Sequence, residues 1–531
     1  MSVLLTRRAV VQAAIEDTYG TPKTMTVNDG VLVSEPTYTI DPNVLERNYT
    51  RDSLSQTPHI IGRKLASMEF TTELRGNGKQ HSGQLADAPI IARLFRACGY
   101  ELKSQTNPWL KGVFEVGAHK SRVSWNGDVT LADNTDVICY FIEVVTGGGS
   151  GVAQVVINSD VEGESSGASA AVKATGSIEF SSQPDPSSTI TLNGSTVTFV
   201  SSTPGSNEVE IGQDLAETLA NLVDFLNSSA DAEISKCTYS ASGGDTLLIE
   251  YDTPGAAGNS FTLAVHADSN GTVSGATLSG GADATTGHTL TSGSPLNVGT
   301  HGLVLTPTFT GDLEEGQKWV LWLMPKGLAL NPISDNFESL TLVMYKDGVK
   351  HVMPGAFGTF EITATAGDFA TIQWTFTGLW QQPVDEPMPT PNYERTMPSQ
   401  VELARLRVGG FHAVVEEFTF DQANDIQPRP DVSSDEGYIG IRIVSRAPEG
   451  GINPEADLVA NNDFWNQLAT AERMPFQMRV GYEQGNTVWM IAPGVQYTGL
   501  TYQDRDGILA YDAGLRFPAY DTDDEICFFF C

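Results

Sequence analysis

The sequence predicts a mainly β protein with flanking helices (α+β), in which one β-sandwich fold occurs twice and further β modules are inserted. Three observations predict this class. The 531 residues include 52 glycines, and with many Ser, Thr and Asp they favour turn-rich β structure over helices. Several segments alternate apolar and polar residues, which is the period of a half-exposed strand. One pattern of strands and turns is also found twice in the chain.

The repeated pattern is a strand, a turn, an apolar stretch that ends in Pro-Gly, a second turn and a closing strand. The interval from Pro354 to Pro493 nearly equals the interval from Gly348 to Gly485, the glycines of the first turns. One fold written twice allows half the usual number of subunits to close a ring. The elements lie at 340–345, 346–348, 353–356, 367–368 and 372–376 in the first copy, and at 476–480, 484–485, 492–495, 506–507 and 509–515 in the second.

A strand and a helix precede this pattern in both copies. In the first copy residues 65–74 alternate, and a helix follows that begins near Pro89 and stops at Gly99. In the second copy residues 439–443 alternate, and Asp463 opens a helix-like run. The expected buried stripes are Ile90, Ile91, Leu94, Phe95 and Cys98 in the first helix and Phe464, Trp465 and Leu468 in the second.

The first copy carries a large insertion. From helix to turn, 258 residues separate Ile90 from Gly348, whereas 21 separate Phe464 from Gly485, so about 237 residues are added at a surface connection. The insertion is itself interrupted, because β patterning near 138–157 resumes only after residue 288. The residues between these parts have an Asn-Gly hairpin and a leucine-striped helix of their own.

A chain of this length is expected to hold several cores. We therefore predict four units, with a Pro-rich linker at 383–398 between the two copies. The units are the first copy at 1–125 plus 327–385, an inserted outer β-sandwich module at 126–173 plus 284–326, a nested α+β module at 174–283, and the second copy at 386–531.

The chain is strongly acidic, with 65 Asp and Glu against 31 Lys and Arg and a net charge of −34. This balance excludes nucleic-acid binding through phosphate contacts, which needs a basic surface. Two interpretations stay open: the charge keeps the protein soluble, or it makes acidic walls past which DNA slides without binding. No window approaches the ~20 apolar residues of a membrane span, and residues 1–8 are not a secretory signal, so we expect use from the cytosol without export.

Five cysteines, an odd number without a CxxC pair, argue against a disulfide framework or a zinc site. Cys527 and Cys531 flank three phenylalanines, an apolar end that is expected to dock on a neighbouring molecule or on the chain's own core. Trp374 and Trp380 occupy strand positions and are expected in the core.

No motif for catalysis, cofactor binding or metal binding is found. The eight histidines are scattered, and no HExxH or GxxxxGK[ST] motif occurs. The residues 163–167 match GxSxG by letter, but they lie in the polar stretch 159–173 and do not make a nucleophile elbow. The glycine run at 147–151 leads into a strand, so it is not a phosphate loop. The acidic run of Asp521, Asp523, Asp524 and Glu525 lacks the Gly and the spaced Glu of a calcium loop, which favours a solvated tail. We expect no enzyme and no cofactor.

Several segments of the first copy resemble the tail tube proteins of long-tailed, non-contractile bacteriophages. The order of these segments carries the resemblance, which is less clear in the second copy. The nested module resembles the small, Ig-like β modules inserted in many phage structural proteins, through 192–194 and 253–260. The segments that carry the tube resemblance are 16–22, 30–36, 45–47, 53–55, 62–64, 88–99, 355–360 and 376–380.

The resemblance implies a fold and an assembly. Tube domains of this family are small β-sandwiches with a flanking helix, and six of them place strands side by side in a barrel-shaped ring. Two copies per chain imply homotrimeric rings of pseudo-sixfold symmetry. Rings stack through a long loop into a tube that carries the tape-measure protein and then viral DNA. The expected partners are other copies of the chain, these two lumen components, and the tail terminator and distal tail proteins at the ends. The expected location is the virion tail, assembled in the host cytoplasm without membrane insertion.

The bore of such a tube should be lined by polar, net acidic strand faces, and the insertion should point outward. The segments 44–63 and 418–437 lack apolar periodicity and occupy matching places in the two copies, so we interpret both as inter-ring loops. The candidate bore-facing residues are Glu69, Thr71, Glu73, Glu361, Thr363, Thr365, Arg442 and Asp512, and the candidate inter-ring loop residues are Glu46, Arg47, Arg51, Asp52, Gln56 and His59.

Other functions stay open from the sequence. The chain could be a virion decoration protein or adhesin whose working part is the inserted modules, a cell-wall hydrolase, or a tail terminator or connector ring with the same fold. Deletion of 126–326 separates the first case, since a tube protein should still polymerise without these residues. Zymography would reveal a hydrolase, and the copy number per virion separates a tube subunit from a single connector ring.

Overall fold

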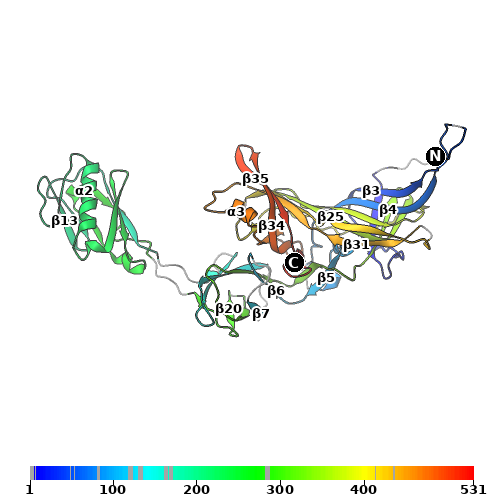
Figure 1. The fold of residues 1–531 in the computed structure, drawn as a ribbon, viewed down its shortest axis with the longest axis horizontal. Helices are drawn as coiled ribbons and strands as arrows, with labels where there is room; N and C mark the ends of the chain where they lie inside the picture. The colour runs from blue at the N-terminus through cyan, green and yellow to red at the C-terminus, as the bar shows by residue number, and fades with distance from the viewer. Residues whose placement is uncertain are drawn as a thin grey trace.

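The protein is mainly β, as expected, and three α-helices occur among the described residues: α1 (Ile91–Ala97), α2 (Leu215–Ser228) and α3 (Phe464–Ala469). In Figure 1 the unit around α2 stands apart from the sheets that carry β3, β25 and β34. The computed structural model describes residues 5, 7–47, 49–52, 54–79, 84–117, 123–129, 136–160, 165–166, 172–281, 287–299, 301–412, 414–434 and 437–531.

Each copy has two sheets that are joined by one long, bent strand. In the first copy this strand is β25 (Val349–Thr365), which pairs first with β24 (Leu340–Lys346) and then with β26 (Thr371–Leu379). It bends at Gly355, where φ is +62° and an added Cβ would lie 3.2 Å from the Tyr19 ring, so glycine suits this corner. The other strands of this copy are β1 (Ala9–Ile15), β2 (Gly30–Val31), β3 (Ser34–Leu45), β4 (Ile60–Glu73) and β27 (Val384–Asp385).

The second copy repeats this arrangement. Its long strand is β34 (Val488–Arg505), which pairs first with β33 (Met474–Val480) and then with β35 (Ile508–Arg516). The repeat that the two Pro-Gly pairs predict is therefore confirmed in the strand topology. The other strands are β28 (Arg407–Val408), β29 (Val415–Asp421), β30 (Asn424–Pro430), β31 (Tyr438–Arg446), β32 (Glu449–Pro454) and β36 (Cys527–Phe530).

The two copies share both layers of the sandwich. In one layer β25 pairs with β29, which makes a single sheet of eight strands in the order β3-β4-β26-β25-β29-β32-β35-β34. In the other layer β36 lies between β34 and β23 (Gly327–Pro332), a strand that follows the insertion. The apolar end at 527–531 thus docks on the chain's own core, one of the two places expected for it.

Aromatic side chains from both copies fill the space between the layers. The ring centroid of Phe95 lies 5.0 Å from that of Trp374 and 4.9 Å from that of Phe528. Phe360 of the first copy lies 5.9 Å from Phe420 of the second. One apolar cluster therefore crosses the junction, and burial of large aromatic side chains on this scale stabilises the two copies as one unit.

Both helices of the two copies form where the sequence predicts them. Gly99 follows the last turn of α1 with φ of +89°, the left-handed conformation that glycine adopts readily after a helix. The Asp463 side chain accepts a hydrogen bond from the Asn466 N–H, which caps α3. The predicted stripe of α1 is buried, whereas in α3 Phe464 is buried and Trp465 is 39% exposed.

The insertion begins and ends on a two-stranded stem in which β5 (Tyr100–Gln105) pairs with β23. β6 (Trp109–Glu115) pairs with β22 (Lys318–Met324), so the sandwich starts before the predicted boundary at 126. Its other strands are β7 (Ser124–Val129), β8 (Ile138–Thr146), β9 (Gln154–Ser159), β10 (Ser165–Ser166), β19 (His288–Thr289), β20 (Leu296–Val298) and β21 (Leu303–Thr308).

The inserted sandwich packs on the second copy. Trp322 of β22 and Trp489 of β34 are fully buried in one apolar cluster. The Asp136 carboxylate accepts hydrogen bonds from Arg479 Nη1 at 2.8 Å and from Trp489 Nε1 at 3.0 Å. Trp322 Nε1 donates to Gln477 Oε1 at 2.8 Å. The sandwich is therefore part of the contact that holds the two copies together.

The nested module has a core of its own, with α2 packed on its strands. Asn193 and Gly194, with φ of +46° and +90°, make the tight turn between β12 and β13, as their sequence predicts. Ala174 and Gly281, at the two ends of this module, lie close together, since an added Cβ on Gly281 would be 3.0 Å from that of Ala174. Its strands are β11 (Thr175–Phe180), β12 (Thr189–Leu192), β13 (Ser195–Val200), β14 (Glu208–Glu210), β15 (Cys237–Ser242), β16 (Thr246–Tyr251), β17 (Leu263–Val265) and β18 (Gly271–Val273).

Three sequence interpretations need correction. The segment 418–437 is not one long loop, because β29 and β30 occupy most of it and only 431–437 connects β30 to β31. The Pro-rich segment 383–398 joins the copies but is packed on the first: the Glu394 carboxylate accepts a hydrogen bond from the Ile90 N–H at 2.9 Å. Trp380 is half-buried beneath the Lys64 ammonium, 4.3 Å from the ring centroid, so it is less buried than the core position expected for it.

Candidate functional site

The candidate site is the polar face of the eight-stranded sheet. Residues that lie opposite each other in an antiparallel pair are on the same face, so the register connects side chains from strand to strand. Across the junction between the copies, Glu361 lies opposite Asp421 and Thr365 lies opposite Glu417. The register carries this face onward through Asp421 to Glu449 and through Glu449 to Arg516. One polar face therefore runs through both copies, and at the end with Leu65 and Phe357 the same face becomes apolar and is buried against β31.

Seven of the eight candidate bore-facing residues lie on this face. Arg442 does not, because β31 pairs with β30 in a separate two-stranded hairpin. The chain leaves the eight-stranded sheet at Ala423, whose φ is +49°, and re-enters it after Pro448, which has no N–H to donate. The seven residues on the face are Glu69, Thr71, Glu73, Glu361, Thr363, Thr365 and Asp512.

This face is net acidic. Its carboxylates are spread over six of its eight strands, with threonine and glutamine between them, and the same register also places the basic residues Arg505 and Arg516 on it. The opposite face of the same strands is apolar and buried, so the sheet separates a charged surface from the core. The carboxylates that the register places on the polar face are Asp41, Glu69, Glu73, Glu361, Glu417, Asp421, Glu449 and Asp512.

The eight-stranded sheet has an open edge at each end among the described residues. At one end β3 pairs with β4 alone, and at the other the second half of β34 pairs with β35 alone. An unpaired edge presents N–H and C=O groups that can pair with another chain. The Tyr502 side chain on the β34 edge is 56% exposed. The two edges, one from each copy, are the feature that sequence reasoning did not find.

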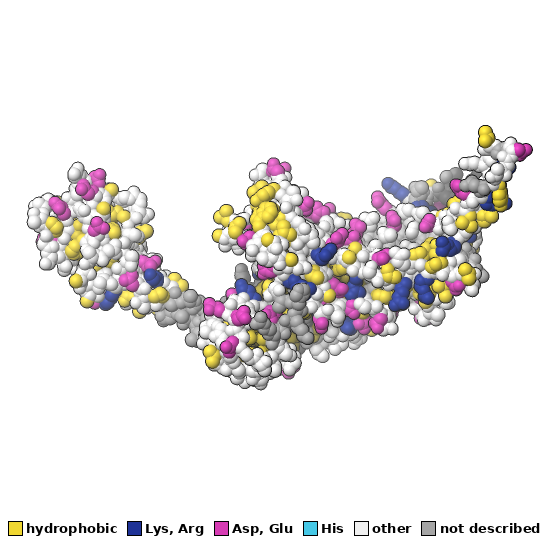
Figure 2. All heavy atoms as spheres, in the orientation of Figure 1, with side chains coloured by type: hydrophobic (Ala, Val, Ile, Leu, Met, Phe, Trp, Pro, Cys, Tyr) yellow, Lys and Arg dark blue, Asp and Glu magenta, His cyan; other side chains and the backbone are white. Residues whose placement is uncertain are grey.

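An exposed apolar patch lies beside the β34 edge, at the tip of the β34–β35 hairpin and on α3. Figure 2 shows it as a yellow area over the position of β35 and α3 in Figure 1. Such a cluster of exposed apolar side chains is typical of an interaction surface. Its members are Leu458, Val459, Trp465, Tyr502, Ile508 and Leu509.

The candidate inter-ring residues Glu46, Arg47, Arg51, Asp52, Gln56 and His59 lie between β3 and β4, and all are exposed. The Arg47 guanidinium lies over the Tyr49 ring, 5.0 Å from its centroid. These residues follow the end of β3 at Leu45, whereas the tip of the β34–β35 hairpin is at the opposite end of the strands. Figure 1 shows β3 and β4 at one end of the two copies and β35 with α3 at the other.

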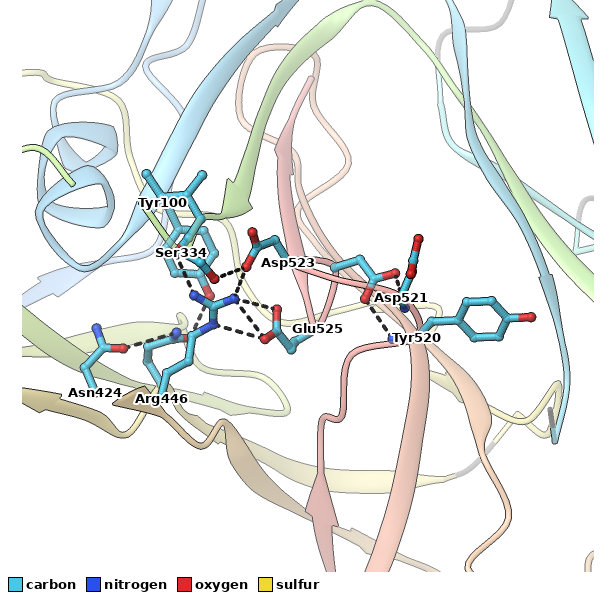
Figure 3. A network of polar contacts seen from close by, with 11 residues as sticks. Tyr100, Ser334, Asn424, Arg446, Tyr520, Asp521, Asp523 and Glu525 are labelled. Carbon is cyan, nitrogen blue, oxygen red and sulfur yellow. Dashed lines mark hydrogen bonds and ion pairs between the residues drawn. The ribbon is translucent and has the colours of Figure 1, made fainter. Parts of the chain in front are cut away.

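The acidic run near the C-terminus is not the solvated tail that the sequence predicts. Figure 3 shows the Arg446 guanidinium between Asp523 and Glu525, and its Nη1 also donates to the Ile333 carbonyl at 2.6 Å. Partial burial disfavours a charged Asp523, but hydrogen bonds from Ser334 and Arg446 outweigh it, so the pKa of Asp523 lies below its usual value. These residues tie the insertion stem to β31 and hold the two copies in place.

The described residues contain no group of three or more His, Cys, Asp or Glu side chains placed to hold a metal ion. None of their helices is long and apolar enough to cross a membrane. A scan against models of known protein families finds no match to the chain, and a search of curated proteins finds no significant match. The acidic face and the two open edges are therefore the features of the molecule that bear on its function.

Proposed function

We propose that the protein is a tail tube subunit of a long-tailed, non-contractile phage, whose chains join edge to edge into rings that stack into a conduit for DNA. The observation that carries the proposal is the single sheet in which two copies of one fold stand side by side with both outer edges open. Because the copies are already joined by strand pairing, the same pairing between chains extends the sheet until it closes.

The number of strands favours a ring of three chains. Eight strands closed on themselves would make a barrel that is filled by side chains. Three chains would give 24 strands and a barrel about 48 Å across at the backbone, with strands about 4.8 Å apart and tilted by roughly 40°. Such a barrel leaves room for a hydrated DNA duplex. Six equivalent domains in the ring give the pseudo-sixfold symmetry that the sequence resemblance implies.

The acidic face suits the wall of a DNA conduit. In a closed barrel one face of the sheet must point inward, and here the other face is buried by the second layer. A wall of carboxylates repels phosphate, so DNA would pass without the counterion-releasing contacts that hold it on basic surfaces. The same geometry would serve a single connector ring, which differs from a tube in that it does not stack.

Electron microscopy of the purified full-length protein tests the proposal. Hollow filaments, with rings of three chains in averaged end views, are the expected result. Discrete rings that never stack would favour the connector function. A monodisperse monomer in light scattering across a wide range of protein concentration would overturn the proposal.

A further inference from the structure

We infer that neighbouring chains meet through β34 of one chain and β3 of the next, in the register that β25 and β29 use inside the chain. The inference rests on the proposed function, because a ring needs such a seam. It adds the residues that face each other across the seam. The chain itself contains one complete seam, the β25–β29 pair between its two copies. A seam between two chains must join the equivalent edges, which are β34 and β3.

The two hairpins show which residue of β34 is equivalent to Glu361 of β25. Glu361 lies opposite Gln373 in the β25–β26 hairpin, and Thr501 lies opposite Asp512 in the β34–β35 hairpin. The interval from Gln373 to Asp512 in the sequence is the same as the interval between the two Pro-Gly pairs. Thr501 is therefore the counterpart of Glu361.

The neighbouring strands show which residue of β3 is equivalent to Asp421 of β29. Asp421 lies opposite Glu449, which lies opposite Arg516. Thr39 lies opposite Ser67, which lies opposite Thr377. The interval from Thr377 to Arg516 again equals that between the two Pro-Gly pairs, so Thr39 is the counterpart of Asp421.

The two equivalences together give the register of the seam. Inside the chain Glu361 lies opposite Asp421. Between chains their counterparts, Thr501 and Thr39, would lie opposite each other. On the core side, Ile362 lies opposite Phe420 within the chain, and their counterparts Tyr502 and Tyr38 would lie opposite each other between chains. The register is not carried as far as Arg505, because β3 has a bulge between Ser34 and Thr37 and the Arg505 side chain pairs with Glu416 inside the chain.

The side chains on both edges fit this register. The Tyr502 ring is largely exposed in the isolated chain, and the Tyr38 hydroxyl is buried without a hydrogen-bond partner. Pairing the two strands in this register would cover the Tyr502 ring. Ile40, 38% exposed, lies on the same face as Tyr38, so the seam would have an apolar side toward the core and a polar side toward the bore.

The apolar patch at the tip of the β34–β35 hairpin supports the same contact. In the first copy the equivalent tip is covered by the second copy, since the Val401 N–H donates to the Asp368 carbonyl at 2.7 Å and the Gly367 N–H to the Val401 carbonyl at 3.2 Å. In the second copy the Ala456 N–H donates to the Leu509 carbonyl at 2.9 Å, but the Ile508 and Leu509 residues stay more than half exposed. The neighbouring chain would cover it.

Engineered disulfides test the register. Facing pairs in an antiparallel ladder alternate between Cα separations of about 4.5 and 5.5 Å, and both fall in the range that a disulfide accepts. We would prepare Thr501→Cys with Thr39→Cys, and Tyr502→Cys with Tyr38→Cys. The control is Thr501→Cys with Thr37→Cys, which keeps the face but slips the register by two residues. The five native cysteines are buried, so the parent protein serves as the blank.

The matched variants, oxidised after assembly, should give covalent dimers and trimers on a non-reducing gel and stop at the trimer, while the slipped variant and the parent stay monomeric. Matched variants that stay monomeric although microscopy shows tubes would overturn the seam and leave the proposed function standing. Preferential cross-linking of the slipped pair would overturn the register. If the parent forms no rings or tubes, the proposed function and the seam both fail.

An edge-blocking variant gives a second, independent readout. Tyr502→Lys places a charge in the apolar side of the seam, and we expect assembly to be lost while circular dichroism and thermal unfolding stay close to those of the parent. Leu248→Lys, an exposed apolar residue of the nested module, is the matched control and should assemble normally. Tubes of Tyr502→Lys as abundant as those of the parent would contradict the seam.

Discussion

Glu361 of the first copy lies directly opposite Asp421 of the second, in a strand pair that makes one sheet of the two halves of the chain. Two carboxylates that face each other across a ladder repel, and such a pair is weakly destabilising. The apolar pairs on the other side of the same strands hold the junction together. The polar side is therefore free to carry charge for a purpose other than stability.

The first prediction concerns this junction. Phe420 is buried in the core that both copies share, beside Phe360 and Phe528. Phe420→Ala should lower the free energy of unfolding by about 3–5 kcal/mol, because it leaves a cavity between the copies. Urea unfolding measures the loss. Phe369→Ala is the control, since that side chain is 43% exposed, and an equal loss in both variants would mean that the junction is not a shared core.

The second prediction concerns the contact between the inserted sandwich and the second copy. Asp136 holds Arg479, whose side chain is 8% exposed, and Trp489. Asp136→Ala leaves a nearly buried guanidinium without this carboxylate and should cost about 1–3 kcal/mol, less than a fully buried pair because Asp136 is itself one third exposed. Limited proteolysis should then cut the inserted sandwich faster. Unchanged cleavage rates would show that the apolar cluster alone holds the sandwich.

The third prediction revises the deletion that the sequence suggests. Removing 126–326 would expose Trp489 and Phe529, which the sandwich covers, so we expect this variant to aggregate whatever its function. Removing 172–281 and joining the ends with a short Gly-Ser linker deletes a module with its own core. This second variant should fold and form tubes with a smaller outer diameter in electron micrographs. Loss of assembly in it would mean that the nested module takes part in the ring.

How much could be predicted from the sequence depends on how local each signal is. The Pro-Gly pairs and turn glycines are local, and they give the repeat and its long bent strands. The alternation of Phe418 and Phe420 could have identified β29, although the segment that contains it is interpreted from the sequence as a loop. The pairing of β25 with β29 is not local, because strand order depends on contacts between distant residues. For this reason the sequence did not reveal that Arg442 lies outside the larger sheet, in a hairpin set off by two breaks; its position relative to a bore stays a prediction.

The fourth prediction concerns pH. Burial lowers the pKa of His351 below its ordinary 6.5. The unfolded chain therefore binds a proton at this residue more readily than the folded chain does. The stability that the fold gains from a neutral His351 is present above pH 6.5. It is lost as the pH falls toward the pKa of His351 in the folded protein, which is the lower of the two. The thermal unfolding temperature should fall in this window, and His351→Phe should flatten that part of the curve. An unchanged slope in the variant would contradict the prediction.

The last prediction tests which way the acidic face points. Reversing Glu69, Glu361 and Glu449 to lysine places three positive charges per chain on the polar face, and nine in a ring of three chains. Tubes of this variant should take up short duplex DNA in a form that nuclease cannot reach, because phosphate contacts now form inside the bore. Uptake should weaken steeply with salt, by a slope of roughly −0.9 for each phosphate neutralised.

A matched control carries the same change of charge on the nested module, as Glu179→Lys, Glu210→Lys and Asp224→Lys, at three exposed positions. DNA bound there would lie on the outside of a tube and would be digested. Protected DNA in the first variant but not in the control would place the acidic face in the passage. If both variants protect DNA equally, or if neither does, the face that joins Glu361 to Asp421 does not line the bore, and the role of the sheet as a DNA conduit would have to be abandoned.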